Sequence, residues 1–145
     1  MRSWWFVRQG LLAVAAVAFV SVALVSVAIE PAVAQGAQGF PFGRELRMEA
    51  RPLKGSKRVP FVEIAENGTA VIDMWCDSVQ SQFVVAADTI TVLIGQKTQR
   101  NCTPEQARAD GELLDALQQA TNWKREGDGV VLLGARPLKF RPSTN

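Results

Sequence analysis

Two cysteines, Cys76 and Cys102, carry the most reactive side chains of this sequence. Thiols can form a disulfide, bind a metal or act as nucleophiles. A cysteine nucleophile needs a base such as histidine, and a zinc site needs about four good ligands, yet the sequence contains neither histidine nor tyrosine. We therefore expect Cys76 and Cys102 to form a disulfide. Two separate buried thiols are the alternative.

Paired carboxylates are the catalytic groups that remain, because two Asp or Glu can perform acid–base chemistry without histidine. Asp73 and Asp77 are the candidates, since they flank Trp75 and Cys76. Their spacing along the chain does not show whether the two side chains meet. We expect no catalytic residue, no metal site and no cofactor, and we classify the chain as a non-enzyme.

The first 34 residues have the features of a secretory signal peptide. Arg2 and Arg8 precede an apolar run at residues 11–29, and an A-x-A site ends at Ala34. We expect cleavage after Ala34 and a periplasmic or secreted protein, in a compartment where disulfides persist. An uncleaved leader that anchors the protein in the membrane is the alternative, because the apolar run is just long enough to span a bilayer.

Basic residues outnumber acidic ones between residues 44 and 58. The formal net charge of the whole chain is only +2, so its composition predicts no binding to nucleic acid. The basic stretch is either a solvated face or a contact for an anionic surface, such as lipid headgroups or a polyanionic envelope polymer. We take Lys54, Lys57 and Arg58, together with Trp75, as candidate surface contacts.

Most of the chain after the leader has the alternating pattern of β-strands. Strands are expected at residues 45–53, 61–66, 69–75, 82–86, 88–94, 122–126, 130–133 and 138–140. In the hairpin of residues 122–133, Trp123 can pair with Leu132 if Gly127 and Asp128 form the turn. A tight turn is also expected at Ala87-Asp88.

The dipeptide Asn67-Gly68 predicts a hairpin with a two-residue type I′ turn. That turn would pair Ala65 with Ala70, Glu63 with Ile72, and Phe61 with Met74. The face of the second strand with Ala70, Ile72, Met74 and Cys76 should then be the core side, apart from the cross-strand Glu63.

One amphipathic helix is expected after Cys102. Thr103 is a favourable N-cap, Pro104 suits the first helical position, and Gln106 completes a capping box. The apolar face contains one polar exception, Asp110, among Ala107, Leu113, Leu114, Leu117 and Ala120. We expect this face to cover a sheet. Binding of a partner is the alternative for the same helix.

These elements predict an α+β fold, in which one helix packs on a small curved antiparallel sheet or open barrel. Residues 1–34 are the leader, residues 35–43 are expected to be a flexible lead-in, and residues 44–142 form the domain. We expect this domain to be a monomer.

An ordered series of residues resembles the META domain of the bacterial HslJ-like heat-inducible proteins. The series consists of Trp75-Cys76, Ile90-Thr91-Val92, Thr98, Cys102-Thr103-Pro104, Leu113-Leu114, Ala116-Leu117, Trp123, Gly127-Asp128, Val130, Leu138 and Phe140. The family often has asparagine after the first cysteine, where this chain has Asp77. The resemblance implies a small β-rich domain of the cell envelope, linked to stress tolerance and without an established catalytic activity.

Two functions are compatible with the sequence. The first is a non-enzymatic exported protein that contributes to envelope stress tolerance by binding an unidentified envelope protein or ligand. The alternative is a dedicated binding module, either an inhibitor of an envelope hydrolase or a carrier of an apolar ligand. An exposed cluster around Trp75, Phe83 and Trp123 would favour the binding module.

Overall fold

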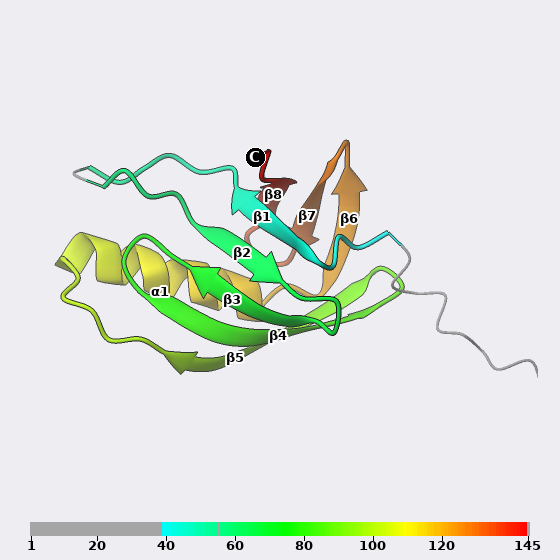
Figure 1. Ribbon diagram of the computed structural model, residues 1–145, viewed down its shortest axis with the longest axis horizontal. Coiled ribbons are helices and arrows are strands. Elements are labelled where there is room, and N and C mark those ends of the chain that lie inside the picture. Colours follow the sequence, from blue (N-terminus) through cyan, green and yellow to red (C-terminus); the bar gives the residue numbers. More distant parts are fainter. Residues whose placement is uncertain (1–38, 55, 145) are drawn as a thin grey trace, which may run out of the picture. The chain divides into compact units, whose positions relative to one another are not determined.

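The computed structural model describes residues 39–54 and 56–144. The predicted leader and residues 35–38 of the lead-in lie outside them. Eight antiparallel strands form a closed barrel in sequence order, and helix α1 lies between β5 and β6 in the chain (Figure 1). The elements are β1 Arg44–Met48, β2 Phe61–Ile64, β3 Thr69–Asp73, β4 Ser78–Ala86, β5 Thr89–Lys97, α1 Pro104–Gln118, β6 Asn122–Glu126, β7 Gly129–Leu133 and β8 Leu138–Pro142. Within the described residues, no helix is long and apolar enough to cross a bilayer.

The sheet closes because the last strand returns to the first. β8 pairs with β1 from Leu46–Pro142 to Met48–Phe140. The weakest seam is between β5 and β6, which share the single pair Thr89–Asn122. Helix α1 contacts β5. The expectation of a small β-rich sheet or barrel with one helix is confirmed, and the sheet is a closed barrel.

Apolar side chains fill the interior of the barrel. The strands contribute Leu46, Val62, Ile64, Ile72, Val79, Phe83, Ile90, Val92, Val130, Leu132, Leu138 and Phe140, each less than 5% exposed. Leu113 and Leu117 of α1 add to the same core and are 1% and 0% exposed. Helix α1 therefore covers the sheet, as its apolar face predicts.

The start of α1 follows the predicted capping chemistry. The Thr103 hydroxyl accepts the Gln106 N–H at 3.2 Å, and the Gln106 side chain accepts the Thr103 N–H at 3.0 Å. Pro104 occupies the first helical position, where no intrahelical donor is needed. These two hydrogen bonds fix the direction in which the chain leaves Cys102.

The predicted register of the first hairpin is wrong by one residue. Ile64 pairs with Ala70 and Glu63 pairs with Val71. The connection is a three-residue loop, because Gly68 donates to the Ala65 carbonyl and only Gly68, at φ +81°, has positive φ there. This geometry is a type I turn followed by a left-handed glycine rather than a type I′ turn.

The corrected register changes the face on which Glu63 lies. A shift of one residue moves a side chain to the opposite face of a strand. Glu63 is consequently exposed, while Val62 and Ile64 face the core at 2% and 1% exposure. The predicted core face of β3 holds, since Ala70 and Ile72 are buried.

We expect Gly68→Ala to destabilise the protein by about 1–3 kcal/mol. Its added Cβ would lie 2.4 Å from the Phe83 carbonyl oxygen, on a backbone that alanine rarely adopts. Gly111→Ala is the matched control, because nothing lies within 4 Å of a Cβ there. In mid-helix this change should stabilise by about 0.5–1 kcal/mol. Urea unfolding measures both variants, and equal effects would contradict the turn geometry.

The described end of the expected flexible lead-in packs against the barrel. Phe40 is 6% exposed, and its ring meets Trp123 edge-on with centroids 5.1 Å apart. The Trp123 indole N–H donates to the Ala87 carbonyl at 2.8 Å. Ordered packing therefore begins before residue 44. The predicted Trp123–Leu132 pair is confirmed.

Strands β1, β4 and β5 differ from their predicted lengths. β1 ends at Met48 rather than residue 53, because residues 49–60 form a long loop to β2. β4 and β5 are longer than predicted and pair from Val79–Lys97 to Ala86–Thr89, with a bulge after Val79. The added length brings the end of β5 beside the β3–β4 loop.

Candidate functional site

One buried carboxylate holds the β3–β4 loop, residues 74–77. Asp110 of α1 is 0% exposed. Its two oxygens accept the backbone N–H groups of Trp75 at 2.9 Å, Cys76 at 3.3 Å and Asp77 at 2.8 Å. The carboxylate compensates for its burial by satisfying three donors that no strand partner reaches.

Sequence reasoning missed the role of Asp110. The signal was present, because a carboxylate on the apolar face of a helix must find donors when that face is buried. The sequence does not show which donors those are. The three N–H groups lie more than 30 residues away in the chain.

Asp77 forms a second polar centre at the same loop and is 4% exposed. Its Oδ2 lies 3.0 Å from the Lys97 ammonium, and its Oδ1 accepts the Arg100 N–H at 2.9 Å. The Arg100 guanidinium also donates to the Cys76 carbonyl at 3.2 Å and to the Ser78 hydroxyl at 3.3 Å. The segment between β5 and α1 is therefore fastened to the β3–β4 loop by charged groups.

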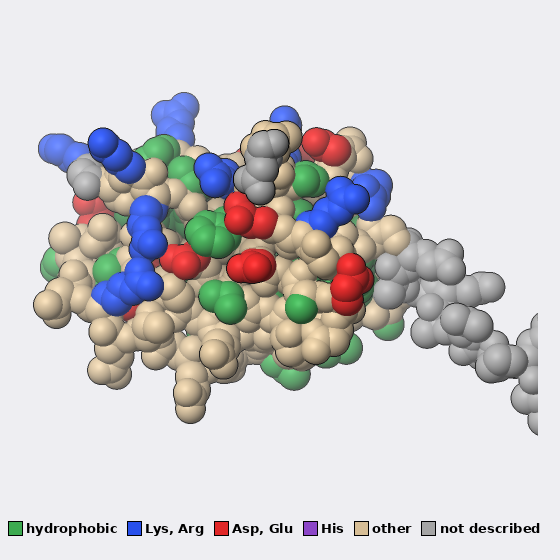
Figure 2. All heavy atoms as spheres, in the orientation of Figure 1, with side chains coloured by type: hydrophobic (Ala, Val, Ile, Leu, Met, Phe, Trp, Pro, Cys, Tyr) green, Lys and Arg blue, Asp and Glu red, His purple; other side chains and the backbone are tan. Residues whose placement is uncertain are grey.

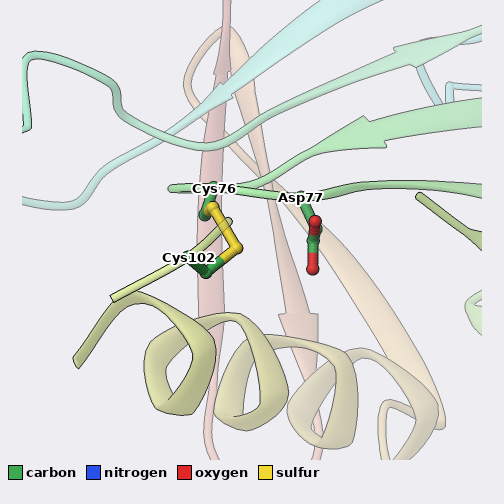
Figure 3. A group of neighbouring side chains, drawn as sticks. All are labelled: Cys76, Asp77 and Cys102. Atoms are coloured by element: carbon green, nitrogen blue, oxygen red, sulfur yellow. A yellow bond between two sulfur atoms is a disulfide. The ribbon is translucent and has the colours of Figure 1, made fainter. Parts of the chain in front are cut away.

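The predicted disulfide between Cys76 and Cys102 is present beside Asp77, with the Cα atoms 5.8 Å apart. Figure 3 shows the Asp77 side chain extending from the loop alongside the disulfide, toward α1. The two sulfur atoms and a carboxylate oxygen of Asp77 lie within 4.8 Å of one another. We call the group Cys76, Asp77 and Cys102 the disulfide cluster.

Each of the two candidate catalytic carboxylates forms an ion pair with a different basic side chain. Asp73 lies 3.6 Å from the Arg58 guanidinium, and Asp77 pairs with Lys97. One oxygen of Asp73 is buried without a hydrogen bond among the described groups. The structure thus explains both residues as parts of ion pairs, and the classification as a non-enzyme stays a prediction.

The β1–β2 loop, residues 49–60, carries exposed cations. Arg51, Lys54, Lys57 and Arg58 are all exposed. Arg58 faces Asp73, whereas Arg51, Lys54 and Lys57 form no ion pair with any described residue. Figure 2 shows basic side chains gathered at the end of the barrel where this loop projects. We call residues 49–60 the basic loop.

Most surface cations elsewhere are paired. Arg47 pairs with Glu45, Arg108 and Arg136 with Glu112, Lys124 and Lys139 with Glu126, and Arg141 with Glu49.

The hydrogen bond and charge of Lys139 lower the pKa of Glu126, and Glu126 raises the pKa of Lys139. The contribution of this exposed pair is therefore lost as the pH falls through the lowered pKa of Glu126. The basic loop differs because its cations are mostly uncompensated.

The expectation that Trp75 lies at the surface is wrong. Trp75 is 9% exposed and belongs to the core cluster, and its backbone N–H donates to the buried Asp110 carboxylate. Its indole nitrogen has no hydrogen-bond partner among the described groups. Phe83 and Trp123 are buried as well, at 3% and 9% exposure. These three residues do not form an exposed aromatic cluster.

Comparison with known proteins identifies the family. The family model described as META domain matches residues 44–144. The chain belongs to the META domain family. This finding confirms the resemblance seen in the sequence, and no curated protein matches the chain significantly.

Two solved structures are similar to this META domain. One is an NMR structure of a protein with 12% identity and a TM-score of 0.54, covering 68% of this chain and 88% of that chain. The other is an NMR structure of a protein from Burkholderia xenovorans, with 16% identity and a TM-score of 0.55, covering 72% of this chain and 84% of that chain. At such identities the likeness shows the fold alone.

Proposed function

We propose that this META domain is a non-enzymatic exported protein that contributes to envelope stress tolerance by binding an anionic lipid surface. The observation that carries the proposal is the basic loop, where Arg51, Lys54 and Lys57 are exposed and lack ion pairs with described residues. Cations near an anionic membrane each contribute about 1 kcal/mol to binding. Export rests on the predicted leader.

The attachment of the basic loop supports this role. Leu53 is partly buried and packs against the core, and the Glu49 N–H donates to the Lys139 carbonyl at 2.8 Å. The loop is thus anchored to the barrel near its start and at its middle, while its cations stay in solvent. A rigid support reduces the conformational entropy that is lost when a loop binds.

We expect the triple variant Arg51→Gln, Lys54→Gln, Lys57→Gln to bind anionic vesicles about 100-fold more weakly. Arg58 is left unchanged because it pairs with Asp73. The measurement is co-sedimentation with phosphatidylglycerol vesicles at low salt, with phosphatidylcholine vesicles as the neutral reference. Binding of the unaltered protein should also fall as salt is added, because salt screens exposed charges.

A control triple variant removes the same number of charges from other faces: Arg44→Gln, Arg108→Gln and Lys124→Gln, all exposed in the structure. We expect its vesicle binding to stay close to that of the unaltered protein. Equal weakening of both triple variants would mean that net charge alone matters. No weakening of the first variant would make the basic loop a solvated face.

The alternative binding module receives less support. Among the described residues, buried side chains pack together in the core of the barrel, which does not favour an apolar ligand inside it. The broad hollow outside β1–β4 is lined by charged groups, including Glu45, Glu63 and Glu66. An exposed aromatic cluster would favour an inhibitor or carrier, but Trp75, Phe83 and Trp123 are buried. The geometry therefore favours contact through the basic loop.

A further inference from the structure

We propose that reduction of the disulfide turns the disulfide cluster into a Zn²⁺ site with three protein ligands: the Cys76 thiolate, the Asp77 carboxylate and the Cys102 thiolate. The inference is independent of lipid binding by the basic loop. It starts from the position of the three ligand atoms, which lie within 4.8 Å of one another.

The ligand types and their positions suit zinc. Zn²⁺ binds cysteine sulfur at about 2.3 Å and carboxylate oxygen at about 2.0–2.2 Å, in a tetrahedron whose fourth position can hold water. Cys76 and Asp77 are adjacent in one loop, and Cys102 reaches them from the segment before α1. Zinc binding requires the two sulfur atoms to move apart after the bond is broken, and the proposal is that rotation of the cysteine side chains, whose Cα atoms are 5.8 Å apart, provides this movement.

The backbone around the ligands is held by groups other than the disulfide. Asp110 accepts the N–H groups of Cys76 and Asp77, so these two ligands keep their places after reduction. The Cys102 N–H donates to the Arg100 carbonyl at 2.9 Å, and the capping box of α1 follows directly. Contacts that do not involve the disulfide therefore hold the backbone of all three ligands.

The negative charge of the three ligands is partly balanced by the zinc ion and by nearby cationic groups. Two thiolates and one carboxylate carry three negative charges, so a bound Zn²⁺ leaves one. The Arg100 guanidinium donates to the Cys76 carbonyl, and the backbone N–H of Arg100 donates to the Asp77 carboxylate and orients it. Such hydrogen bonds to ligands typically strengthen metal binding. Lys97 has the opposite effect, because its ammonium occupies the Asp77 oxygen that faces it.

The chemistry balances with a dithiol or a phosphine as reductant. The disulfide takes up two electrons and two protons to give two thiols, while a dithiol reductant is oxidised to its own disulfide, or a phosphine takes the oxygen of a water molecule and becomes the phosphine oxide. Zn²⁺ then replaces the two thiol protons, which pass to solvent. Reoxidation of the cysteines removes both sulfur ligands, so the disulfide and the zinc site exclude each other.

The test is titration of ZnCl₂ into the purified protein by calorimetry, before and after reduction with a phosphine. We expect one Zn²⁺ per reduced molecule and none for the oxidised molecule. Cys76→Ser with Cys102→Ser should abolish binding. Asp77→Asn should weaken it about tenfold or more, as loss of a supporting or direct ligand does. Lys97→Gln should strengthen it, because the competing ammonium is gone.

Asp73→Asn is the matched control, since it removes a neighbouring carboxylate outside the cluster, and it should leave zinc affinity unchanged. Circular dichroism checks that each reduced variant is folded before zinc is added. Three results would overturn the proposal: zinc binding by the oxidised protein, equal affinity in Asp77→Asn and the unaltered protein, or unfolding of the reduced protein without zinc. If Asp77→Asn does not fold, Lys97→Gln remains the test of the Asp77 ligand, because a rise in affinity is expected when the ammonium 3.0 Å from Asp77 is removed.

Discussion

Replacing Asp110 with alanine is expected to lower the free energy of unfolding by about 3–5 kcal/mol. The carboxylate is fully buried and accepts three backbone N–H groups of the β3–β4 loop. Alanine leaves these donors without acceptors, and each buried donor left unsatisfied costs about 1–3 kcal/mol. The total cost is less than three full penalties, because the loop can move so that water reaches some of these N–H groups. Urea unfolding followed by tryptophan fluorescence measures the change.

Two further variants separate the role of Asp110 from general effects on α1. Asp115→Ala is the control, because Asp115 is exposed on the same helix and its loss should change stability little. The stability of Asp110→Asn should lie between that of Asp110→Ala and that of the native protein. The asparagine carbonyl oxygen still accepts a hydrogen bond, whereas its NH₂ group is a donor and would face a backbone N–H of the loop. Equal stability of Asp110→Ala and Asp115→Ala would show that the loop does not depend on this carboxylate.

The double variant Cys76→Ser, Cys102→Ser is expected to lose about 3–4 kcal/mol of stability. The bond closes a loop with a sequence separation of 26, so it restricts the unfolded chain. Domains of this size have a total stability of about 5–15 kcal/mol, so the loss is severe but leaves a folded protein. Thermal unfolding of the unreduced protein and the variant measures it, and intact mass shows whether the unreduced protein lacks two hydrogen atoms.

Unfolding of the native protein with and without a phosphine reductant provides the control for the serine substitutions. Reduction should reproduce most of the loss without changing the sequence. Identical melting of native, reduced and double-serine proteins would remove the disulfide as a source of stability. Adding Asp110→Ala to the double variant should cost more than the sum of the separate losses, since both features hold residues 74–77.

The local signals in the sequence were sufficient for several elements. Thr103, Pro104 and Gln106 specify the start of α1 through contacts within four residues of one another, which no distant partner needs to complete. The pairing of Trp123 with Leu132 follows in the same way from a short turn and alternating side chains. The two cysteines predict their own bond, because the predicted leader and the lack of histidine leave few other roles for them.

Other features depend on partners far away in the chain. The sequence does not predict the register at Gly68, because Asn-Gly fits both a two-residue turn and a three-residue loop, and packing of Val62 and Ile64 selects the second. The sequence likewise does not predict the burial of Trp75, because nothing in it shows that Asp110 binds the Trp75 N–H.

The family, the helix, most strands and the cysteine pair can be predicted from the sequence. The closure of the barrel by β8 on β1, the attachment of the β3–β4 loop to Asp110, and the contacts of Asp77 with Lys97 and the disulfide depend on tertiary packing. The reason is physical. Turns, caps and alternation act over a few residues, whereas a buried charge is stabilised by whichever donors the fold brings to it, and that depends on how the whole chain packs.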